Sequence, residues 1–426
     1  MKNSHKLSAV EAVEKIRNGS LTAEVLMRSC LDRVLERDEL VKAWAHIDER
    51  QAIAGARNAD AMGNPGPLAG IPIGVKDIID TADMPTRNGS TIYESNQPNE
   101  DASIVRKTRS IGGVIMGKTV TTEFAWRKPG ATCNPHNPEH TPGGSSSGSA
   151  AGVADYQFPL AFGTQTGGSI IRPAAYCGVV GFKPTVGTHD RKGVKELSSY
   201  LDTVGTMARS IQDVAFFDSA LRGLTIPDLK IFDNNPPRIG IMVPFRANAE
   251  EHALIALERG LRKAEKSGAT VIDIPTSKNF ETLGDIHNTV MIGDAGRALA
   301  WEADHYPERL SRFYIENIAA GQAISNELLE KAKAEGKSSE REQAAALFEH
   351  VDILMTLPAP GEAPKGFDFT GDPLFNKVWT ILGWPCVNIP FETGPLGLPL
   401  GLQIVAPANE DSLALAASAW LEKTLS

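Results

Sequence analysis

The chain has 426 residues, of which 42% are hydrophobic and 22% charged, and its formal net charge is −9 at pH 7. The acidic excess disfavours nonspecific binding to nucleic acid, and no apolar run approaches the roughly 18 residues needed to span a bilayer. The four cysteines are scattered without CxxC pairing, which indicates neither a zinc site nor a disulfide framework.

The N-terminal residues are predicted to form two amphipathic helices. Ser8 and Glu11 have the spacing of a capping box, and Thr22 is a candidate start for the second helix. Apolar residues recur on one helical face in each segment, so both helices are expected to pack on a larger body. The segment MKNSHKLSAVEAVEKI has no uninterrupted apolar core of a signal peptide, which favours a cytoplasmic protein.

From Pro67 onward the pattern changes to short β-branched runs separated by Gly, Pro and Asn, such as IPIGVKDII, GGVIMGKT and GVVGFKPT. A helical stretch, EEHALIALERGLRKAEKSG, is followed at once by the strand-like ATVIDIP. Alternating strands and helices predict an α/β fold with helices covering a largely buried sheet. We interpret NNPP at residues 234–237 as a loop within one domain, because the strand-like RIGIMVPF follows it directly.

The segment TPGGSSSGSAAG at residues 141–152 has the composition of a flexible linker. It continues, however, into the helical pattern SAAGVADYQ and a second turn, GTQTGGSIIRP, which a linker would not do. The residues GSSSG also match a G-x-S-x-G nucleophile elbow with Ser146 at its centre. That motif requires a preceding strand, and NPHNPEHTPG cannot be a central strand. A tightly shaped functional turn is therefore the better interpretation.

Several blocks of the sequence resemble the amidase signature family. The segment GGSSSGSAAG, followed by GTQTGGSIIRPAAYCGVVGFKPT, is similar to the signature itself, and PLAGIPIGVKDIIDT, GGVIMGKTVTTEFA, LDTVGTMARSIQDVA and LPLGLQIVAP are similar to further blocks in the expected order. The resemblance implies one domain over residues 1–426, with a mixed central sheet covered by helices on both faces. Within it, residues 1–60 are expected to be helical, 61–215 to hold the catalytic core, and 216–426 to complete the sheet and pocket.

The resemblance also implies a Ser–cis-Ser–Lys triad. Carried over to this chain, Ser169 is the nucleophile, Ser145 the bridging residue after a cis peptide, and Lys76 the base. The backbone N–H groups of Thr166, Gly167, Gly168 and Ser169 would form the oxyanion hole. Lysine acts as a base only when neutral, and apolar neighbours of Lys76 would favour that form. No metal or cofactor is implied.

Other residues near these blocks have more than one interpretation. Ser146 is expected to support Ser145 and to contribute to substrate binding. Asp77 either orients Lys76 or caps a turn, and Cys177 is expected to be a buried structural residue rather than a thiol nucleophile. Because no acid partner is suggested by spacing, the three histidines near the signature are interpreted as structural or adjacent to the substrate. They are His136, His140 and His189.

The arginine after the nucleophile departs from the common family pattern. In most members this segment reads GGSIRxP, with the arginine two positions beyond the nucleophile. This chain reads GGSIIRP and has Arg172 three positions beyond Ser169. That spacing, with ATCNPHNPEHTPGG and TGDPLFNKVWTILGWPCVNIP, is most similar to malonamidase, where the arginine binds a substrate carboxylate. The resemblance thus predicts an amidase for a small acid such as malonamate. An internal salt bridge, for instance to Asp190, is the structural alternative for Arg172.

Two other functions stay open from the sequence. The family's glutamyl-tRNA amidotransferase A subunit uses the same triad in a multi-subunit complex, so this chain could be a partner-dependent component that delivers ammonia, although its arginine spacing and acidic balance argue against this. It could instead be an amidase for another small acid or urea derivative of the biuret or allophanate type. The expected partners are a small amide substrate and a second copy of the chain as a homodimer. Nucleic acid and membrane are not expected.

Overall fold

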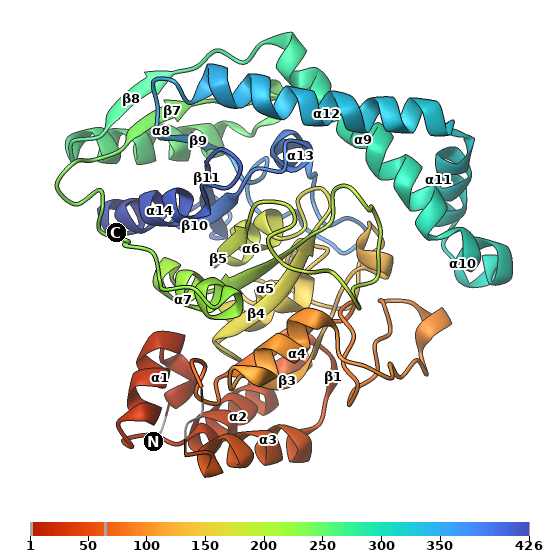
Figure 1. The fold of residues 1–426 in the computed structure, drawn as a ribbon, viewed down its shortest axis with the longest axis vertical. Helices are drawn as coiled ribbons and strands as arrows, with labels where there is room; N and C mark the ends of the chain where they lie inside the picture. Colours follow the sequence, from red (N-terminus) through yellow and green to blue (C-terminus); the bar gives the residue numbers. More distant parts are fainter. Residues whose placement is uncertain (1–2, 64–65, 426) are drawn as a thin grey trace.

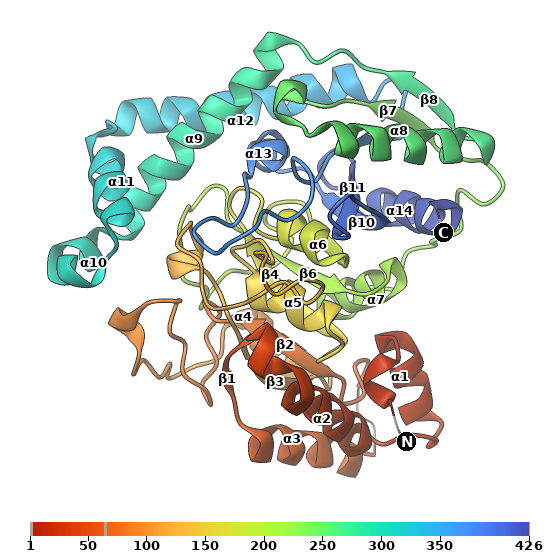
Figure 2. The same cartoon turned by 180° about the vertical axis from the view of Figure 1, so that it is seen from behind.

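A computed structural model describes residues 3–63 and 66–425 of the chain. One sheet of 11 strands runs through the molecule, in the order β1-β3-β2-β4-β6-β5-β10-β11-β9-β7-β8 (Figures 1 and 2). The strands are β1 Trp44–Ile47, β2 Pro72–Lys76, β3 Val114–Thr119, β4 Leu160–Gln165, β5 Val180–Lys183, β6 Thr203–Ala208, β7 Arg238–Ile241, β8 Thr270–Asp273, β9 Ile353–Thr356, β10 Cys386–Thr393 and β11 Pro399–Val405.

Helices pack around this sheet, and their bounds follow the chain order. They are α1 Ala9–Arg17, α2 Ala23–Val41, α3 Glu49–Ala61, α4 Ser103–Ser110, α5 Ser147–Ala154, α6 Ile171–Cys177, α7 Ile211–Arg222, α8 Glu251–Lys266, α9 Lys278–Ala298, α10 Ala300–His305, α11 Arg312–Ala323, α12 Asn326–Leu347, α13 Leu374–Ile381 and α14 Asp411–Leu425. The predicted capping box is formed, since Ser8 and Glu11 bond each other's backbone N–H groups at the start of α1.

The sheet is mixed, as predicted. β2 pairs in parallel with both β3 and β4. In the next part of the sheet, neighbouring strands are antiparallel, in the order β4-β6-β5-β10-β11-β9. The segment 72–76 is buried throughout, which explains why its sequence has no polar alternation. The loop at 234–237 precedes β7, which joins the same sheet, so the NNPP segment divides no domain.

The N-terminal 60 residues are not only helical, because β1 lies among them. β1 pairs antiparallel with β3 at the edge of the sheet. Trp44 explains this placement: its ring packs edge-on against Phe158 at a centroid distance of 4.9 Å, and its indole N–H donates to the Gln157 side chain at 2.7 Å. The four residues of β1 are too few to give a clear alternating pattern in the sequence.

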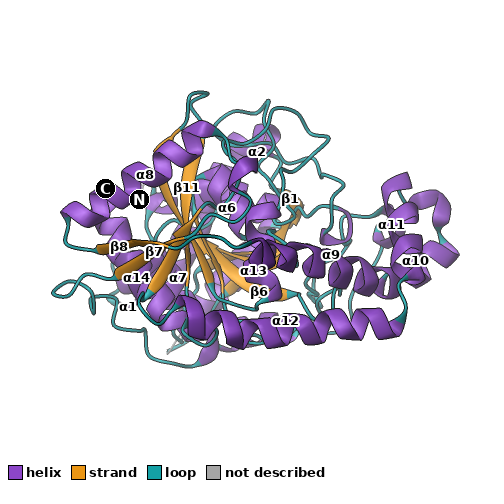
Figure 3. Cartoon of the chain, turned by 90° about the horizontal axis from the view of Figure 1, so that it is seen from above, coloured by secondary structure: helices purple, strands orange, loops and turns teal. Residues whose placement is uncertain are grey.

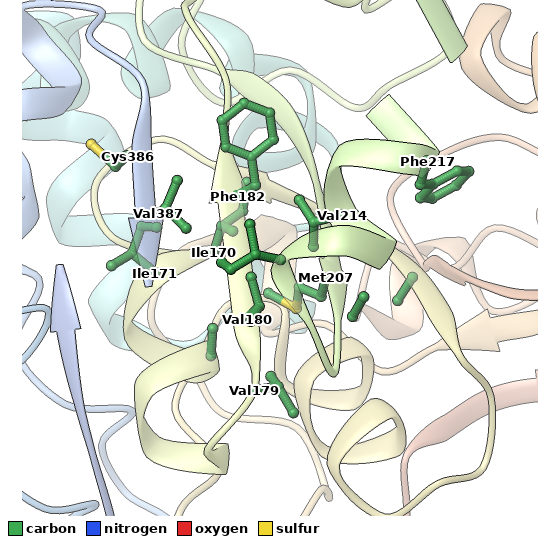
Figure 4. Close-up of a cluster of buried hydrophobic side chains, with 14 of the residues drawn as sticks. Ile170, Ile171, Val179, Val180, Phe182, Met207, Val214, Phe217, Cys386 and Val387 are labelled. Carbon is green, nitrogen blue, oxygen red and sulfur yellow. The ribbon is translucent and has the colours of Figure 1, made fainter. Parts of the chain in front are cut away.

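The main hydrophobic core lies between the sheet and its covering helices. Figure 4 shows one part of it, where Ile170 and Ile171 from the start of α6 lie near Val180 and Phe182 of β5. All four side chains have 0% exposure. The residues that follow Ser169 in the chain are therefore fixed by apolar packing, and this packing holds the preceding turn in place.

A second, smaller core joins the outer helices to the loops beside β2 and β3. The helices α9, α10 and α11 extend away from the sheet together (Figures 1 and 3). Tyr314 of α11 is fully buried against Phe124 and Trp126, with edge-to-face ring contacts at 5.7 and 5.5 Å. Within residues 3–63 and 66–425, no helix has the length and hydropathy to cross a membrane.

Candidate active site

Lys76 is the last residue of β2, one of the central strands, and its side chain has 0% exposure. Its ammonium nitrogen Nζ is 2.7 Å from Ser145 Oγ and 2.7 Å from Thr164 Oγ1, with the Thr164 carbonyl at 3.3 Å. Three oxygen atoms therefore surround the nitrogen. The structure brings together Lys76 and Ser145, which are 69 positions apart in the sequence, as the resemblance implies.

Burial lowers the pKa of Lys76 well below its ordinary value. The Asp202 carboxylate opposes this shift and raises the Lys76 pKa, whereas the Arg172 guanidinium lowers it further. No carboxylate among the described residues bonds Lys76 directly, and its partners are hydroxyl and carbonyl oxygens. The environment of Lys76 thus favours the neutral amine that can accept a proton.

The Gly/Ser segment before α5 is buried and closely packed rather than a linker. Ser145 and Ser146 have 0% exposure, and the Gly144–Ser145 peptide bond is cis. Gly143 has a φ of 80°, and a Cβ there would approach Pro173 Cα to 2.8 Å. Gly148 is more constrained, because a Cβ would come within 2.2 Å of the Ala43 carbonyl oxygen. Small residues are required because neighbouring backbone leaves no space for larger ones.

Ser146 has the supporting role expected of it, whereas its expected contact with substrate stays a prediction. Its hydroxyl is bonded to the Thr164 backbone, accepting from the N–H at 3.2 Å and donating to the carbonyl at 3.3 Å. Ser146 is absent from the described residues that line the cavity beside Ser169. The structure therefore places Ser146 as a support that holds the Ser145 turn to β4, and gives no substrate contact for it.

Ser169 lies in the turn 166–169 between β4 and α6, and is 7% exposed. Its carbonyl oxygen accepts a bond from the Ser146 N–H at 3.3 Å, which brings the two glycine-rich turns together. Among the described hydrogen bonds, none joins the Ser169 and Ser145 hydroxyls. The Gln165 side-chain oxygen accepts from the Ile170 and Ile171 N–H groups at 2.9 and 3.1 Å, so it fixes the turn where α6 begins.

The backbone N–H groups of Gly167, Gly168 and Ser169 donate no hydrogen bond within the described part of the chain. Buried N–H groups without partners are rare, and a turn that presents several of them is suited to hold developing negative charge. A Cβ at Gly168 would come within 2.9 Å of the side-chain ends Arg172 Nη1 and Asn376 Nδ2, so both side chains would have to move. The turn thus has the donors that an oxyanion hole needs.

Residues that the sequence analysis did not single out hold this turn from outside. The Thr166 hydroxyl donates to Asp202 Oδ1 at 2.5 Å, and His287 Nε2 donates to the Thr166 carbonyl at 2.7 Å. Thr380 of α13 donates to the Gly167 carbonyl at 2.8 Å. Asp202 lies in the quoted block LDTVGTMARS, but no pattern in the sequence relates it, His287 and Thr380 to one turn.

The charge states of these supporting groups follow from their surroundings. His287 is fully buried, and burial lowers its pKa to about 3, so it is a neutral donor above that pH. Burial raises the pKa of Asp202, while the bonds from Thr166 and from the Leu197 and Ser198 N–H groups lower it. Both groups act on Thr166, one through its hydroxyl and the other through its carbonyl.

Arg172 is on the first turn of α6, facing the same region as Ser169. The side chain is 3% exposed, and burial lowers its pKa to about 10. Nε donates to the Thr370 carbonyl at 2.8 Å and Nη2 to the Gly144 carbonyl at 2.6 Å, whereas the buried Nη1 has no partner within the described residues. No described carboxylate forms an ion pair with Arg172, so the expected alternative of a salt bridge to Asp190 is not formed.

A small cavity of about 30 Å³ opens beside Ser169 and Arg172. Its wall includes the turn 166–169, Trp126 and Arg127, and the segment around Thr370 from the C-terminal part of the chain. No cluster of acidic, histidine or cysteine side chains within the described residues has the arrangement of a metal site.

The alternative residues near the signature are engaged elsewhere. Asp77 is paired with the buried Lys118 at 3.1 Å, not with Lys76. His136 and His140 bond the carbonyls of Cys177 and Ala363 at 2.9 and 2.7 Å. His189 is bonded to Asp218 at 2.9 Å, and burial raises the pKa of the Cys177 thiol, which disfavours its thiolate. Asp77, Cys177 and these histidines therefore have structural partners away from Ser169.

One protein family, Amidase, matches residues 25–415 of the chain. The chain belongs to the amidase signature family. A relative from Salinispora arenicola, the A-type subunit of glutamyl-tRNA(Gln) amidotransferase, is 31% identical over 98% of this chain and 97% of its own length. A solved structure described as an amidase is 29% identical with a TM-score of 0.89, covering 99% of this chain and 100% of its own.

A further solved structure has the same TM-score of 0.89 at 26% identity, covering 98% of both chains, and is described as a complex that reveals the origins of an s-triazine catabolic enzyme. These comparisons confirm the predicted single α/β domain and the predicted amide-hydrolysing class of enzyme. The finer similarity to malonamidase stays a prediction, and two relatives at 31% and 30% identity are named as A-type subunits of amidotransferases.

Proposed function

We propose that this amidase hydrolyses a small amide bearing a carboxylate, such as malonamate, to the acid and ammonia. The observation that carries the proposal is the Arg172 guanidinium. It is buried beside Ser169, has no acidic partner among the described residues, and leaves Nη1 unbonded at the cavity wall. Buried arginines are ordinarily paired, so the missing partner is supplied by the ligand.

In the proposed reaction, neutral Lys76 accepts a proton from the Ser145 hydroxyl, which in turn accepts the proton of Ser169. The Ser169 oxygen attacks the amide carbon, and the oxyanion is held by the N–H groups of the turn 166–169. The same relay returns the proton to the leaving nitrogen, so ammonia departs and an acyl-enzyme forms. Water, activated by the same relay, then attacks the acyl group and releases the acid.

Arginine is suited to fix the acid end of such a substrate. The unbonded Nη1 of its planar guanidinium can donate a charge-assisted hydrogen bond to a carboxylate, and the fixed plane sets the direction of that bond. Nε and Nη2 are already bonded to the Thr370 and Gly144 carbonyls, so the guanidinium has a fixed position before the ligand arrives. A preorganised cation close to Ser169 favours a short acyl group over a long one.

We predict that Arg172→Ala lowers kcat/KM for malonamate by about ten- to a hundredfold, because a charge-assisted hydrogen bond contributes about 1.5–3 kcal/mol. The neutral methyl ester of malonamate should lose much less. Arg172→Lys keeps the charge but not the planar donors, and should recover only part of the loss. Equal losses on the charged and neutral amides would show that Arg172 holds the fold and not the ligand.

The relatives named as amidotransferase subunits favour a second candidate function, delivery of ammonia within a larger complex. A third, hydrolysis of a biuret- or allophanate-type substrate, is favoured by the likeness to a complex described as revealing the origins of an s-triazine catabolic enzyme. Ammonia release by the purified chain alone separates the three. Malonamate, glutamine, allophanate and biuret would be compared at equal concentration, and our proposal expects malonamate to be the best substrate without any added partner.

The Asp202 carboxylate should both hold the oxyanion turn and set the pKa of Lys76. Asp202→Asn removes a negative charge that raises the Lys76 pKa, so the acid limb of the pH–rate profile should move to lower pH. Thr166→Val removes the bond to Asp202 but keeps its charge, so it should lower kcat by about tenfold without moving that limb. An acid limb at the same pH in wild type and Asp202→Asn would contradict this role.

A further inference from the structure

Two cationic side chains besides Arg172 lie at the cavity wall or on the helix beside it. Arg127 lines the cavity, and Lys377 lies in α13, one helical turn after the cavity-lining Pro373. Arg172 is the third cation. Within the described residues, neither Arg127 nor Lys377 forms an ion pair or a side-chain hydrogen bond. An unpaired cation is unusual at the nearly buried position of Lys377, because buried charges are normally neutralised by a partner.

Lys377 is a less expected position than Arg127 for a cation without a partner. Its side chain is only 7% exposed, on the helix α13 that holds the oxyanion turn through Thr380 and approaches Gly168 through Asn376. Burial lowers the pKa of Lys377. The Asp372 and Asp285 carboxylates raise it, and Arg127 and Arg172 lower it further. An additional negative charge at this position would therefore be stabilised by all three cations.

Arg127 is held at the opening of the cavity by an aromatic surface. Its guanidinium lies over the ring of Phe313 at 5.9 Å from the centroid, and Phe313 packs edge-on against Trp126, which lines the same cavity. A cation–π contact at this distance restrains the side chain without neutralising its charge. Arg127 is exposed, so its charge is available to an arriving ligand.

We propose that Arg127 and Lys377 form a second anion subsite at the opening of the cavity, which recognises a further acidic group on the acyl part of the substrate. This inference rests on the proposed function, because it assumes that Arg172 takes a first carboxylate near Ser169. The substrate class is then an amide whose acyl group carries two acidic groups. The Asp372 and Asp285 carboxylates both offset part of the charge at Lys377, so three cations face two carboxylates.

Two pairs of compounds that differ by one carboxylate test the subsite. In kinetics, glutaramate would be compared with 3-carboxyglutaramate, and in calorimetry glutarate with tricarballylate. The wild-type protein should prefer the compound with the extra carboxylate by about three- to tenfold in kcat/KM and in Kd. Arg127→Gln, at an exposed position, should reduce that preference at least threefold, and Lys377→Met should reduce it further.

The matched control is Lys128→Gln, which removes one positive charge from the neighbouring exposed residue. Lys128 is 53% exposed and lies 3.5 Å from Glu123, outside the described cavity wall. The preference for the extra carboxylate should remain in this variant, which separates a subsite from general electrostatic attraction of anions.

The inference would be overturned if Arg127→Gln left the tricarballylate preference unchanged, or if glutarate and tricarballylate bound equally. Either result would overturn it even if malonamate is hydrolysed. If no amide is hydrolysed, the proposed function fails, whereas the calorimetry still decides the subsite.

Discussion

Ser169→Ala should abolish amide hydrolysis, with kcat reduced by roughly 10⁴-fold or more, because the attacking oxygen is removed while the fold is retained. Ser169 is nearly buried in a turn fixed by Gln165 and by the packing of Ile170 and Ile171. Loss of one hydroxyl there should leave the thermal unfolding midpoint close to that of the wild type. Ammonia release and circular dichroism measure the two effects separately.

Cys177→Ser is the matched control for this loss. Cys177 is the last residue of α6, the short helix that follows Ser169, and it is fully buried. Exchange of its thiol for a hydroxyl therefore tests the other nucleophilic side chain near the signature. Activity should remain in Cys177→Ser. Near-normal turnover in Ser169→Ala, or a loss in Cys177→Ser that matches it, would remove Ser169 from the proposed reaction.

Lys76→Met should lower kcat by about 10²- to 10⁴-fold, since the relay loses its base while the length of the side chain is kept. In the wild type, activity should fall as the pH drops through the lowered pKa of Lys76, because protonation fills the lone pair that accepts the Ser145 proton. The measurement is the pH–rate profile of kcat/KM, recorded with the same amide for each variant.

Lys183→Met provides the control, because Lys183 is equally buried but bonds the Pro184 carbonyl instead of a serine. Its variant should keep the acid limb of the profile, as should His136→Gln and His140→Gln. His287 is neutral over this range, since its pKa is lowered to about 3. An acid limb that disappears in a histidine variant, but persists in any residual activity of Lys76→Met, would contradict a lysine base.

The fold was largely predictable because its strong patterns are local. The apolar runs that became β2, β3 and β5 are continuous, and α8 and α1 show clear helical periodicity with recognisable ends. β1 escaped prediction because it is short and owes its place to contacts with β3, Phe158 and Gln157, which lie more than 60 positions away. Such contacts leave no periodic signal in the sequence.

In the site, too, residues within recognisable sequence blocks were predicted, whereas residues placed by long-range contacts were not. Lys76, Ser145 and Ser169 were assigned from a family resemblance, and the structure places Lys76 against Ser145 as that resemblance implies. Asp202 and His287 hold the turn 166–169 through Thr166. Both come from segments whose sequence gives no reason to associate them with Thr166. Ser146 was expected to support Ser145, and its bonds to the Thr164 backbone of β4 show how it does so.

The measurement that tests the central claim most directly is trapping of the acyl-enzyme. Wild-type protein turning over malonamate would be quenched with acid and its peptides analysed by mass spectrometry, and a parallel sample would receive hydroxylamine. We predict a malonyl group on the peptide at Ser169 and formation of the malonyl hydroxamate, because hydroxylamine intercepts an acyl ester. Malonamate hydrolysis that proceeds with no hydroxamate, or with the acyl group on another residue, would contradict the account.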